Sequence, residues 1–324
     1  MLSNVKLFDV SVESTMLLRL LRNSPLLESF IANAVKINED LNPVIHALSA
    51  SLPRLRTFEL QTAVQSSSAT VLHNQLIAHL IFPDTANVSI QYSDSITSIS
   101  DLNLLLFFMQ TVPHDIRWSL KLHGAMFDFQ ILPSAVHTQY GRRVITIRAF
   151  SWERLVLILR DRSEVLSEHL GQRISKLHIG LTMKLQGPQD VTALAELYAI
   201  LTSVRSIHTS DGSSAGGCLA LAGNDTTNSE FPCPNLRRLR LGRELQHFEH
   251  YNEYTQQYEL RFLNAQSIVE WLGPRVRAGM GPSALRLDSI KQNSDAAVDP
   301  ALVALIPDTR YVKDNDPDSD DEYM

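Results

Sequence analysis

Residues 233–241 read Cys233-Pro-Asn-Leu-Arg-Arg-Leu-Arg-Leu241, a turn-forming segment that runs into alternating leucines and arginines. This alternation has the period of a β-strand with one buried face. Two earlier stretches have the same form: Leu52-Pro-Arg-Leu-Arg-Thr-Phe-Glu-Leu60 and Ile174-Ser-Lys-Leu-His-Ile179. Their recurrence indicates a repeated structural unit, since a fixed period is typical of proteins built by stacking similar units.

The repeat extends along most of the chain, with one central apolar anchor residue in each expected strand. Seven of the eight spacings between successive anchors fall between 25 and 32 residues, and the last is 46. The anchors are Phe30, Phe58, Val88, Leu120, Ile145, Leu177, Ile207, Leu239 and Leu285.

Between the anchors the apolar period changes from 2 to 3.6, which predicts helices. Ser151 and Asp190 stand at expected helix N-caps. The expected helical ranges are 16–21, 44–52, 72–80, 101–112, 152–170, 191–201, 265–272 and 300–306. The pattern predicts an α/β solenoid of about nine strand–helix units over residues 1–306, with a curved parallel sheet inside and helices outside. The 47 leucines of the 324 residues suit such a fold, because each unit buries its apolar face only against neighbours.

The charge of the chain is concentrated at its end. The formal net charge is −6, yet residues 314–322 hold six acids and no base, which leaves 29 acids and 29 bases elsewhere. We expect residues 307–324 to be a disordered acidic tail. Ser319 precedes Asp320, Asp321 and Glu322 and is therefore a candidate for phosphorylation by an acid-directed kinase.

The segments Leu52–Leu60, Ile174–Ile179 and Cys233–Leu241 resemble the L-x-x-L-x-L core of leucine-rich repeats. Two of them, with Ser24-Pro-Leu-Leu-Glu-Ser-Phe30, are similar to the "(L/C)P-x-L-x-x-L-x-L" lines of fungal F-box-like proteins. The resemblance covers roughly residues 5–290. It implies a repeat scaffold that binds proteins, as in the substrate-recognition part of an F-box-like ubiquitin-ligase receptor.

This sequence departs from the family at two points. The usual Asn or Cys position is occupied by Ala63, Thr182 and Glu244, and no F-box motif stands near the N-terminus. We therefore expect a ubiquitin-ligase adaptor as partner only if an F-box lies upstream of Met1. The alternative is a repeat-only scaffold with no ubiquitin link.

Catalytic motifs are weak. Gly212-Ser-Ser214-Ala-Gly216 matches the G-x-S-x-G string of serine hydrolases, with Asp225 and His247 following in the appropriate order. Its flanks suit a surface loop better, so a hydrolase acting through Ser214 is the remote alternative. His247 and His250 lack a third metal ligand at a recognised spacing. We expect no enzyme activity, no cofactor and no metal site.

The remaining features concern the compartment. Cys218 and Cys233 are too few for a disulfide framework, and the N-terminus is no signal peptide. The most apolar stretch, 102–112, is about half the length that spans a bilayer. We expect an intracellular protein, cytoplasmic or nuclear, that does not bind membranes.

In the expected solenoid, the residues that alternate with the anchors share one outward face of the sheet. That face becomes cationic toward its C-terminal half. We predict a partner-binding surface for an acidic or phosphorylated protein segment, with the acidic tail as a competitor. Nucleic acid is the less favoured ligand. The candidate residues are Lys121, Arg148, Lys176, His178, His208, Arg238, Arg240 and Arg286.

A second candidate is the long interval after Leu241, which holds His247, Phe248, Tyr251, Tyr254 and Tyr258. Aromatic side chains with polar groups are common in interfaces. An irregular surface insertion without a partner is the other interpretation, and the one that the sequence favours.

Overall fold

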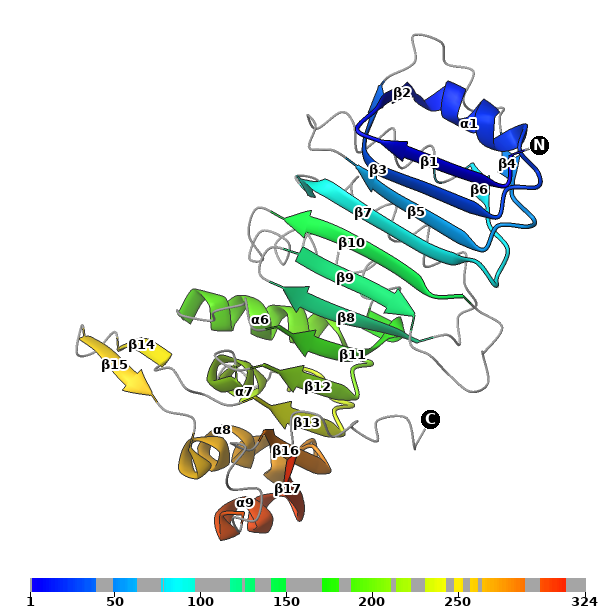
Figure 1. The fold of residues 1–324 in the computed structure, drawn as a ribbon. Helices are drawn as coiled ribbons and strands as arrows, with labels where there is room; N and C mark the ends of the chain where they lie inside the picture. The colour runs from blue at the N-terminus through cyan, green and yellow to red at the C-terminus, as the bar shows by residue number, and fades with distance from the viewer. Residues whose placement is uncertain are drawn as a thin grey trace. The chain divides into compact units, whose positions relative to one another are not determined.

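The fold is taken from a computed structural model, shown in Figure 1. It describes residues 2–38, 49–62, 77, 79–96, 117–123, 126–131, 141–149, 171–180, 188–210, 214–222, 231–242, 248–252, 257–261, 264–288 and 298–312. The chain divides into two compact units. Unit 1 comprises residues 1–116 and 125–151, and unit 2 comprises residues 117–124 and 152–324.

Unit 1 is built on a mainly parallel sheet in the order β1-β3-β5-β7-β10-β9. All pairs are parallel except β10 with β9. The strands of this sheet are β1 (Asn4–Phe8), β3 (Ser29–Asn38), β5 (Thr57–Thr62), β7 (Asn87–Ile96), β9 (Met126–Ile131) and β10 (Arg143–Ala149). Short β2 (Ser11–Glu13) pairs with β3, and β4 (Ala50–Ser51) pairs with β6 (Leu80–Ile81). Helix α1 (Ser14–Arg22) packs on β4.

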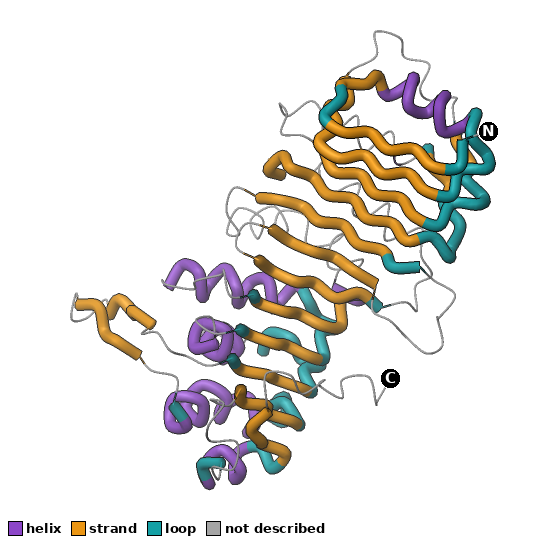
Figure 2. The backbone as a smooth tube through the Cα atoms, viewed as in Figure 1, coloured by secondary structure: helices purple, strands orange, loops and turns teal. Residues whose placement is uncertain are grey.

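Unit 2 contains an all-parallel sheet in the order β8-β11-β12-β13-β16-β17. Its strands are β8 (Trp118–His123), β11 (Ile174–Ile179), β12 (Ser206–Thr209), β13 (Arg238–Leu241), β16 (Ala284–Asp288) and β17 (Asp308–Val312). The helices are α6 (Pro188–Ile200), α7 (Ser214–Ala222), α8 (Ala265–Arg277) and α9 (Pro300–Leu305), and each packs on the next. Figure 2 shows these helices on one side of the strands. A separate antiparallel pair is formed by β14 (Phe248–Asn252) and β15 (Gln257–Arg261).

The anchor residues form the core, as predicted. All nine have exposed fractions of 2% or less. Phe30 lies opposite Phe58, and Phe58 lies opposite Val88, with the two phenyl rings stacked at a centroid distance of 5.1 Å. In unit 2, each anchor lies opposite the anchor of the neighbouring strand, in the order Leu120, Leu177, Ile207, Leu239 and Leu285. Burying each such side chain contributes about 1.5–3 kcal/mol, so these rows hold the strands in register.

A repeated turn precedes the strands. In five places among the described residues, the backbone N–H of a residue two or three positions before an anchor donates to the carbonyl three residues earlier. The pairs are Leu27 with Ser24, Leu55 with Leu52, Ala86 with Pro83, Val204 with Leu201 and Leu236 with Cys233. Successive turns are also linked, since the N–H groups of Arg56 and Thr57 donate to Glu28, and those of Arg237 and Arg238 donate to Arg205. Figure 2 shows these turns as loops at the beginnings of the strands.

The α/β class with parallel strands is therefore confirmed, but the described residues do not form the expected run of nine strand–helix units. Chain order is broken between Val88 and Leu177. Strand β10 lies beside β7, where Ile145 is opposite Ile90, and Leu120 of β8 is opposite Leu177. The reason is the additional strand β9, which is formed by the alternating residues from Met126 to Ile131. It pairs antiparallel with β10, and β10 in turn pairs with β7. That alternation was missed in the sequence analysis.

Several predicted boundaries also differ. The helices expected at 16–21, 191–201, 265–272 and 300–306 are present as α1, α6, α8 and α9. Asp190 lies inside α6 and is not its N-cap, because the helix begins at Pro188, a residue type suited to the first helical position. Residues 50–51 and residue 80, which were expected to lie in the last turns of helices, belong to strands β4 and β6. Ser151 and the ranges 101–112 and 152–170 lie outside the described residues.

The expected tail boundary at residue 306 differs as well. Residues Asp308–Val312 form β17, which pairs in register with β16. The chain divides into two compact units by its internal contacts, and the single solenoid domain expected for residues 1–306 stays a prediction. Among the described helices, none combines the length and apolar character needed to cross a membrane.

Candidate functional site

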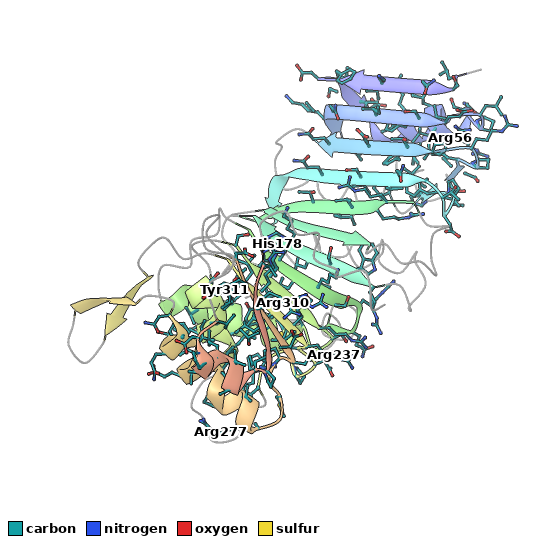
Figure 3. The ribbon with its side chains drawn as sticks, turned by 60° about the horizontal axis from the view of Figure 1, so that its bottom comes forward. Arg56, His178, Arg237, Arg277, Arg310 and Tyr311 are labelled. Atoms are coloured by element: carbon teal, nitrogen blue, oxygen red, sulfur yellow. The ribbon has the colours of Figure 1, made fainter. Side chains whose placement is uncertain are left out.

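A row of outward side chains crosses the sheet of unit 2, with one residue from each strand. The strand register places each member directly opposite the next, and neighbouring strands lie about 4.8 Å apart. We refer to these six residues as the cationic row: Lys121, His178, His208, Arg240, Arg286 and Arg310. Figure 3 labels two of them, His178 on β11 and Arg310 on β17.

A flanking row lies two residues earlier on each strand and faces the same side. Lys176 is opposite Ser206, Ser206 is opposite Arg238, and beyond Arg238 come Ala284 and Asp308. The predicted residues Lys121, Lys176, His178, His208, Arg238, Arg240 and Arg286 are thus brought together on unit 2. Their alignment follows from the buried anchors, because a shift by one residue would turn every apolar side chain outward.

Arg148 is the exception among the predicted residues. It lies on β10 in unit 1, opposite Met126 of β9 and Ser95 of β7. The prediction assumed that strands follow chain order, whereas β10 pairs with β7 and β9. Arg148 therefore has no place in the cationic row.

At the centre of the row, two histidines are stacked. The rings of His178 and His208 have centroids 4.5 Å apart and an angle of 18° between their planes. His178 Nε2 lies 3.0 Å from Ser210 Oγ, and His208 Nε2 lies 3.9 Å from Asp288 Oδ2. Arg240 donates from Nε to the other oxygen of Asp288 at 2.7 Å. A polar network thus joins β11, β12, β13 and β16.

The carboxylate of Asp288 reaches across the sheet to Arg240 and His208. Leu241 is opposite Leu287, so the residue that follows on the β13 side is Gly242, which has no side chain. Arg240 and Asp288 each have a side-chain exposed fraction of 10%. Arg240, a predicted partner-binding residue, is consequently a buried guanidinium that is paired with Asp288.

The second carboxylate of the face is Asp308, at the beginning of β17. Arg286 donates from Nη1 to Asp308 Oδ1 at 3.0 Å and from Nη2 to Oδ2 at 2.9 Å. The hydrogen bond from Arg286, together with the positive charges of Arg286, Arg310 and Arg238, lowers the pKa of the Asp308 carboxyl despite an opposing effect of burial. Asp308 is therefore a carboxylate at neutral pH.

Four further residues of this face were not predicted from the sequence: Ser210, Asp288, Asp308 and Arg310. Asp288 was detectable, since it follows Leu285-Arg-Leu287 and continues the outward positions of that strand. Arg310 lies between Thr309 and Tyr311 in a short alternating stretch that was assigned to the tail. Pairing with β16 makes this stretch a strand, because its own apolar content is too low to predict one.

Ser214 of the G-x-S-x-G string is buried, with an exposed fraction of 0%, and begins α7. Its hydroxyl lies 2.9 Å from Thr209 Oγ1 and donates to the carbonyl of Gly242 at 3.0 Å. It thereby connects β12, α7 and the end of β13, and the surface-loop interpretation of Ser214 is wrong. Gly217 of this helix lies against Thr209 of β12, where an added Cβ would be 2.7 Å from Thr209 Cγ2.

The other motifs are placed as follows. Asp225, His247 and Ser319 lie outside the described residues, and so does the acidic segment 313–324. The interval after Leu241 contains the β14–β15 pair where an irregular insertion was favoured. Cys218 and Cys233 are both buried, and neither is part of a disulfide. Within the part of the chain that the structure describes, no three His, Cys, Asp or Glu side chains are grouped so that they could hold a metal ion.

Unit 1 carries a separate hollow of about 450 Å³ on strands β5, β7 and β10. Glu59 and Arg142 contribute one acid and one base to its lining, and Thr57, Asn87 and Ser89 contribute neutral polar groups. The hollow is therefore close to neutral, in contrast to the outward face of unit 2.

Comparison with known proteins adds no relative. No protein-family model, no curated protein and no solved structure matches the chain.

Proposed function

We propose that the chain is a non-catalytic protein–protein recognition module and that the outward face of unit 2 binds an acidic or phosphorylated protein segment. The in-register cationic row is the observation that carries this proposal. Among the described residues, the two rows hold six Lys or Arg side chains and one carboxylate, Asp308. Asp288 beside the rows adds a second carboxylate, which leaves an excess of four positive charges before any histidine is protonated. Such an excess on a flat sheet attracts anionic partners and speeds their association.

Several features support a protein segment as ligand. Arginine guanidinium groups are suited to planar, bidentate recognition of carboxylate and phosphate. The two hydrogen bonds from Arg286 to Asp308 already show this bidentate geometry within the chain, and Arg240 donates one hydrogen bond to Asp288. The face is a strand surface with aligned rows of side chains, which suits an extended segment better than a small molecule.

Charge reversal tests the proposal. We expect the pair Lys121→Glu and Arg310→Glu to weaken binding of an aspartate- and glutamate-rich peptide library about tenfold or more, because each change places a repelling charge in the row. Arg277→Glu is the matched control, since Arg277 is exposed on α8, away from the strands (Figure 3), and should change affinity less than about twofold. Fluorescence anisotropy at two salt concentrations measures both. Equal loss in the two variants would contradict the proposal.

The same measurement distinguishes a protein ligand from a nucleic-acid ligand. Binding of single-stranded RNA with a steep salt dependence, without binding of either acidic or phosphorylated peptides, would replace the protein ligand with a polyanionic one.

We propose further that the repeated unit is of the leucine-rich kind and that the module resembles the substrate-recognition part of an F-box-like ubiquitin-ligase receptor. This is supported by the turns at Leu52–Leu55 and Cys233–Leu236, which share the same backbone hydrogen bond and each lead into a strand with a buried anchor. A repeat-only scaffold is the alternative. Co-purification of a ubiquitin-ligase adaptor with the natural gene product would support the receptor, and its absence would favour the scaffold.

A further inference from the structure

The Asp308 carboxylate lies among three arginines. Arg286 holds it through two hydrogen bonds of 2.9 and 3.0 Å. Arg286 also donates from Nη1 to the backbone carbonyl of Asp308 at 2.8 Å, which fixes the guanidinium relative to β17. The Arg286 side chain has an exposed fraction of only 6%, whereas that of Asp308 is 58%. The acid therefore covers the arginine and is itself open to solvent.

The other two arginines belong to neighbouring positions of the same face. Arg310 is two residues after Asp308 on β17, so both side chains point to the same side, and it is opposite Arg286. Arg238 is in the flanking row with Asp308, and the residue between them in that row is the small Ala284. Both arginines are close enough to lower the pKa of the Asp308 carboxyl through their charge. We refer to Arg238, Arg286 and Arg310 as the arginine cluster.

The cluster and its carboxylate together carry two positive charges in excess. Asp308 is part of the chain, so it is present at a high effective concentration beside the cluster. A glutamate or aspartate of a partner has the same single charge and the same fork geometry as Asp308. If such a carboxylate replaces Asp308 at the arginine cluster, it adds neither charge nor hydrogen bonds. It must also compete with Asp308, which is part of the chain.

A phosphate monoester differs in both respects. It carries a charge of about −1.5 to −2 at neutral pH and offers three acceptor oxygens. It can take donors from Arg310 and Arg238 together, and its charge matches the excess of the cluster. Hydrogen bonds between charged partners are roughly twice as strong as neutral ones, so the additional oxygens strengthen binding appreciably.

We infer that the arginine cluster is a phosphate-binding subsite that selects phosphorylated over merely acidic segments, and that Asp308 is the internal competitor that produces this selectivity. The inference rests on the proposed function and narrows its ligand to a phosphoserine- or phosphothreonine-containing segment.

Two peptide libraries test it with the full chain: one with phosphoserine fixed at a central position, and one with glutamate at that position and otherwise the same composition. We expect the wild-type protein to bind the phosphoserine library about tenfold more tightly. Asp308→Asn keeps the shape of the side chain and removes its charge. It should raise the affinity for the glutamate library about tenfold and reduce the preference to less than about threefold.

The control for net charge is Glu270→Gln, which removes one exposed acid on α8. It should change both affinities by less than about twofold, because the Glu270 charge is exposed and outside the face. Arg310→Gln should weaken binding of the phosphoserine library about tenfold and leave the fold intact, since Arg310 is exposed. If Asp308→Asn fails to fold, as judged by circular dichroism, the phosphate-binding subsite is tested by Arg310→Gln alone. Unchanged binding of the phosphoserine library by Arg310→Gln then overturns the inference.

The outcomes separate this inference from the proposed function. Equal binding of the two libraries by the wild type, or the same preference in wild type and Asp308→Asn, overturns the selectivity while leaving the recognition of acidic segments in place. Failure of both libraries to bind at low salt overturns the proposed function and the inference together.

Discussion

Arg275 is buried in α8, and its guanidinium donates to three backbone carbonyls, those of Pro232, Cys233 and Met280. Two of these acceptors belong to the turn that begins the stretch Cys233–Leu241. Cys233 has a φ of 49°, in the left-handed region that non-glycine residues rarely occupy. The guanidinium thus stabilises an unfavourable turn conformation by satisfying its carbonyl groups. Nothing in the sequence pattern distinguishes this arginine from those on the outward face.

Replacement of Arg275 by Ala should lower the free energy of unfolding by about 3 kcal/mol, because buried carbonyl groups lose their donors at about 1–3 kcal/mol each. Arg277→Ala, on the exposed side of the same helix, should cost less than about 0.5 kcal/mol. Urea denaturation followed by circular dichroism measures both. Similar losses in the two variants would show that the hydrogen bonds of Arg275 do not stabilise the turn.

Cys233 connects the same turn to α6, since its Sγ lies 3.3 Å from the carbonyl of Tyr198. Burial raises the pKa of its thiol to about 12, and the charge of Arg275 opposes this only in part. The unfolded chain loses this proton near pH 8.5, so the folded state binds more protons between about pH 8.5 and 12. The contribution of this group to stability is therefore complete below about pH 8.5 and declines as the pH rises above it.

A variant with Cys218→Ala leaves Cys233 as the single thiol of the chain. In it, a thiol reagent at pH 8.5 should react only on unfolding, and the free energy of unfolding should fall as the pH rises from about 8.5 to 10.5. A further Cys233→Ala change should flatten that slope. Rapid labelling of the native protein at pH 8.5 would contradict the burial of the thiol.

At the scale of elements, α7 shows how tertiary packing selects a helix that local propensity disfavours. Residues 214–222 include two adjacent glycines, which are poor helix formers. A Cβ added at Gly217 would lie 2.7 Å from Thr209 Cγ2 on β12. The helix can therefore approach the sheet only with glycine at this position, and the gain from packing outweighs the loss of propensity.

Gly217→Ala should destabilise the protein by about 1–3 kcal/mol through overpacking against β12. Gly273 on α8 is the matched control, because a Cβ there would meet only the flexible end of Arg277 at 3.3 Å. Gly273→Ala should stabilise the helix by about 0.5–1 kcal/mol. Thermal unfolding compares the two variants, and a shift of the midpoint in the same direction for both would refute the packing argument.

The strands of the outward face show the opposite balance between sequence and packing. Alternation alone predicted that Lys121, His178, His208, Arg240 and Arg286 share one face, and the register confirms this alignment. Alternation could not predict the two carboxylates that pair with Arg240 and Arg286. Asp308 reaches Arg286 only because β17 pairs with β16, a contact 22 residues apart in the chain.

At the scale of the whole molecule, the end of the folded chain lies later than the charge pattern suggested. Strand β17 covers the edge of β16, and Ile306 and Val312 are buried beside it. Residues 307–324 were expected to be a tail because they are acidic. Their first seven residues contain a single acid, Asp308, and the acidic run starts at Asp314. The tail-competition hypothesis and the phosphorylation of Ser319 stay predictions, since residues 313–324 lie outside the described part.

Two truncations test the boundary. Ending the chain at Val312 should leave the midpoint of thermal unfolding nearly unchanged, because the contacts of β17 are retained. Ending it at Ile306 removes β17 and the partner of Arg286, which leaves a buried guanidinium without its carboxylate and exposes the edge of β16. We expect that shorter chain to unfold at lower temperature or to aggregate, and equal stability of the two chains would place the boundary back at residue 306.

The sequence by itself determined the parts of this protein that depend on short-range periodicity. Those are the anchor residues, the alternation of each strand, the α/β class and the helices at 16–21, 191–201, 265–272 and 300–306. Tertiary structure alone decided which strand pairs with which, and therefore that Arg148 leaves the cationic row while Arg310 joins it. It also decided the partners of Arg240, Arg286 and Arg275, which are distant in sequence. The physical reason is that burial of one face is encoded every second or every third to fourth residue, whereas the pairing of distant segments depends on contacts that no local period records.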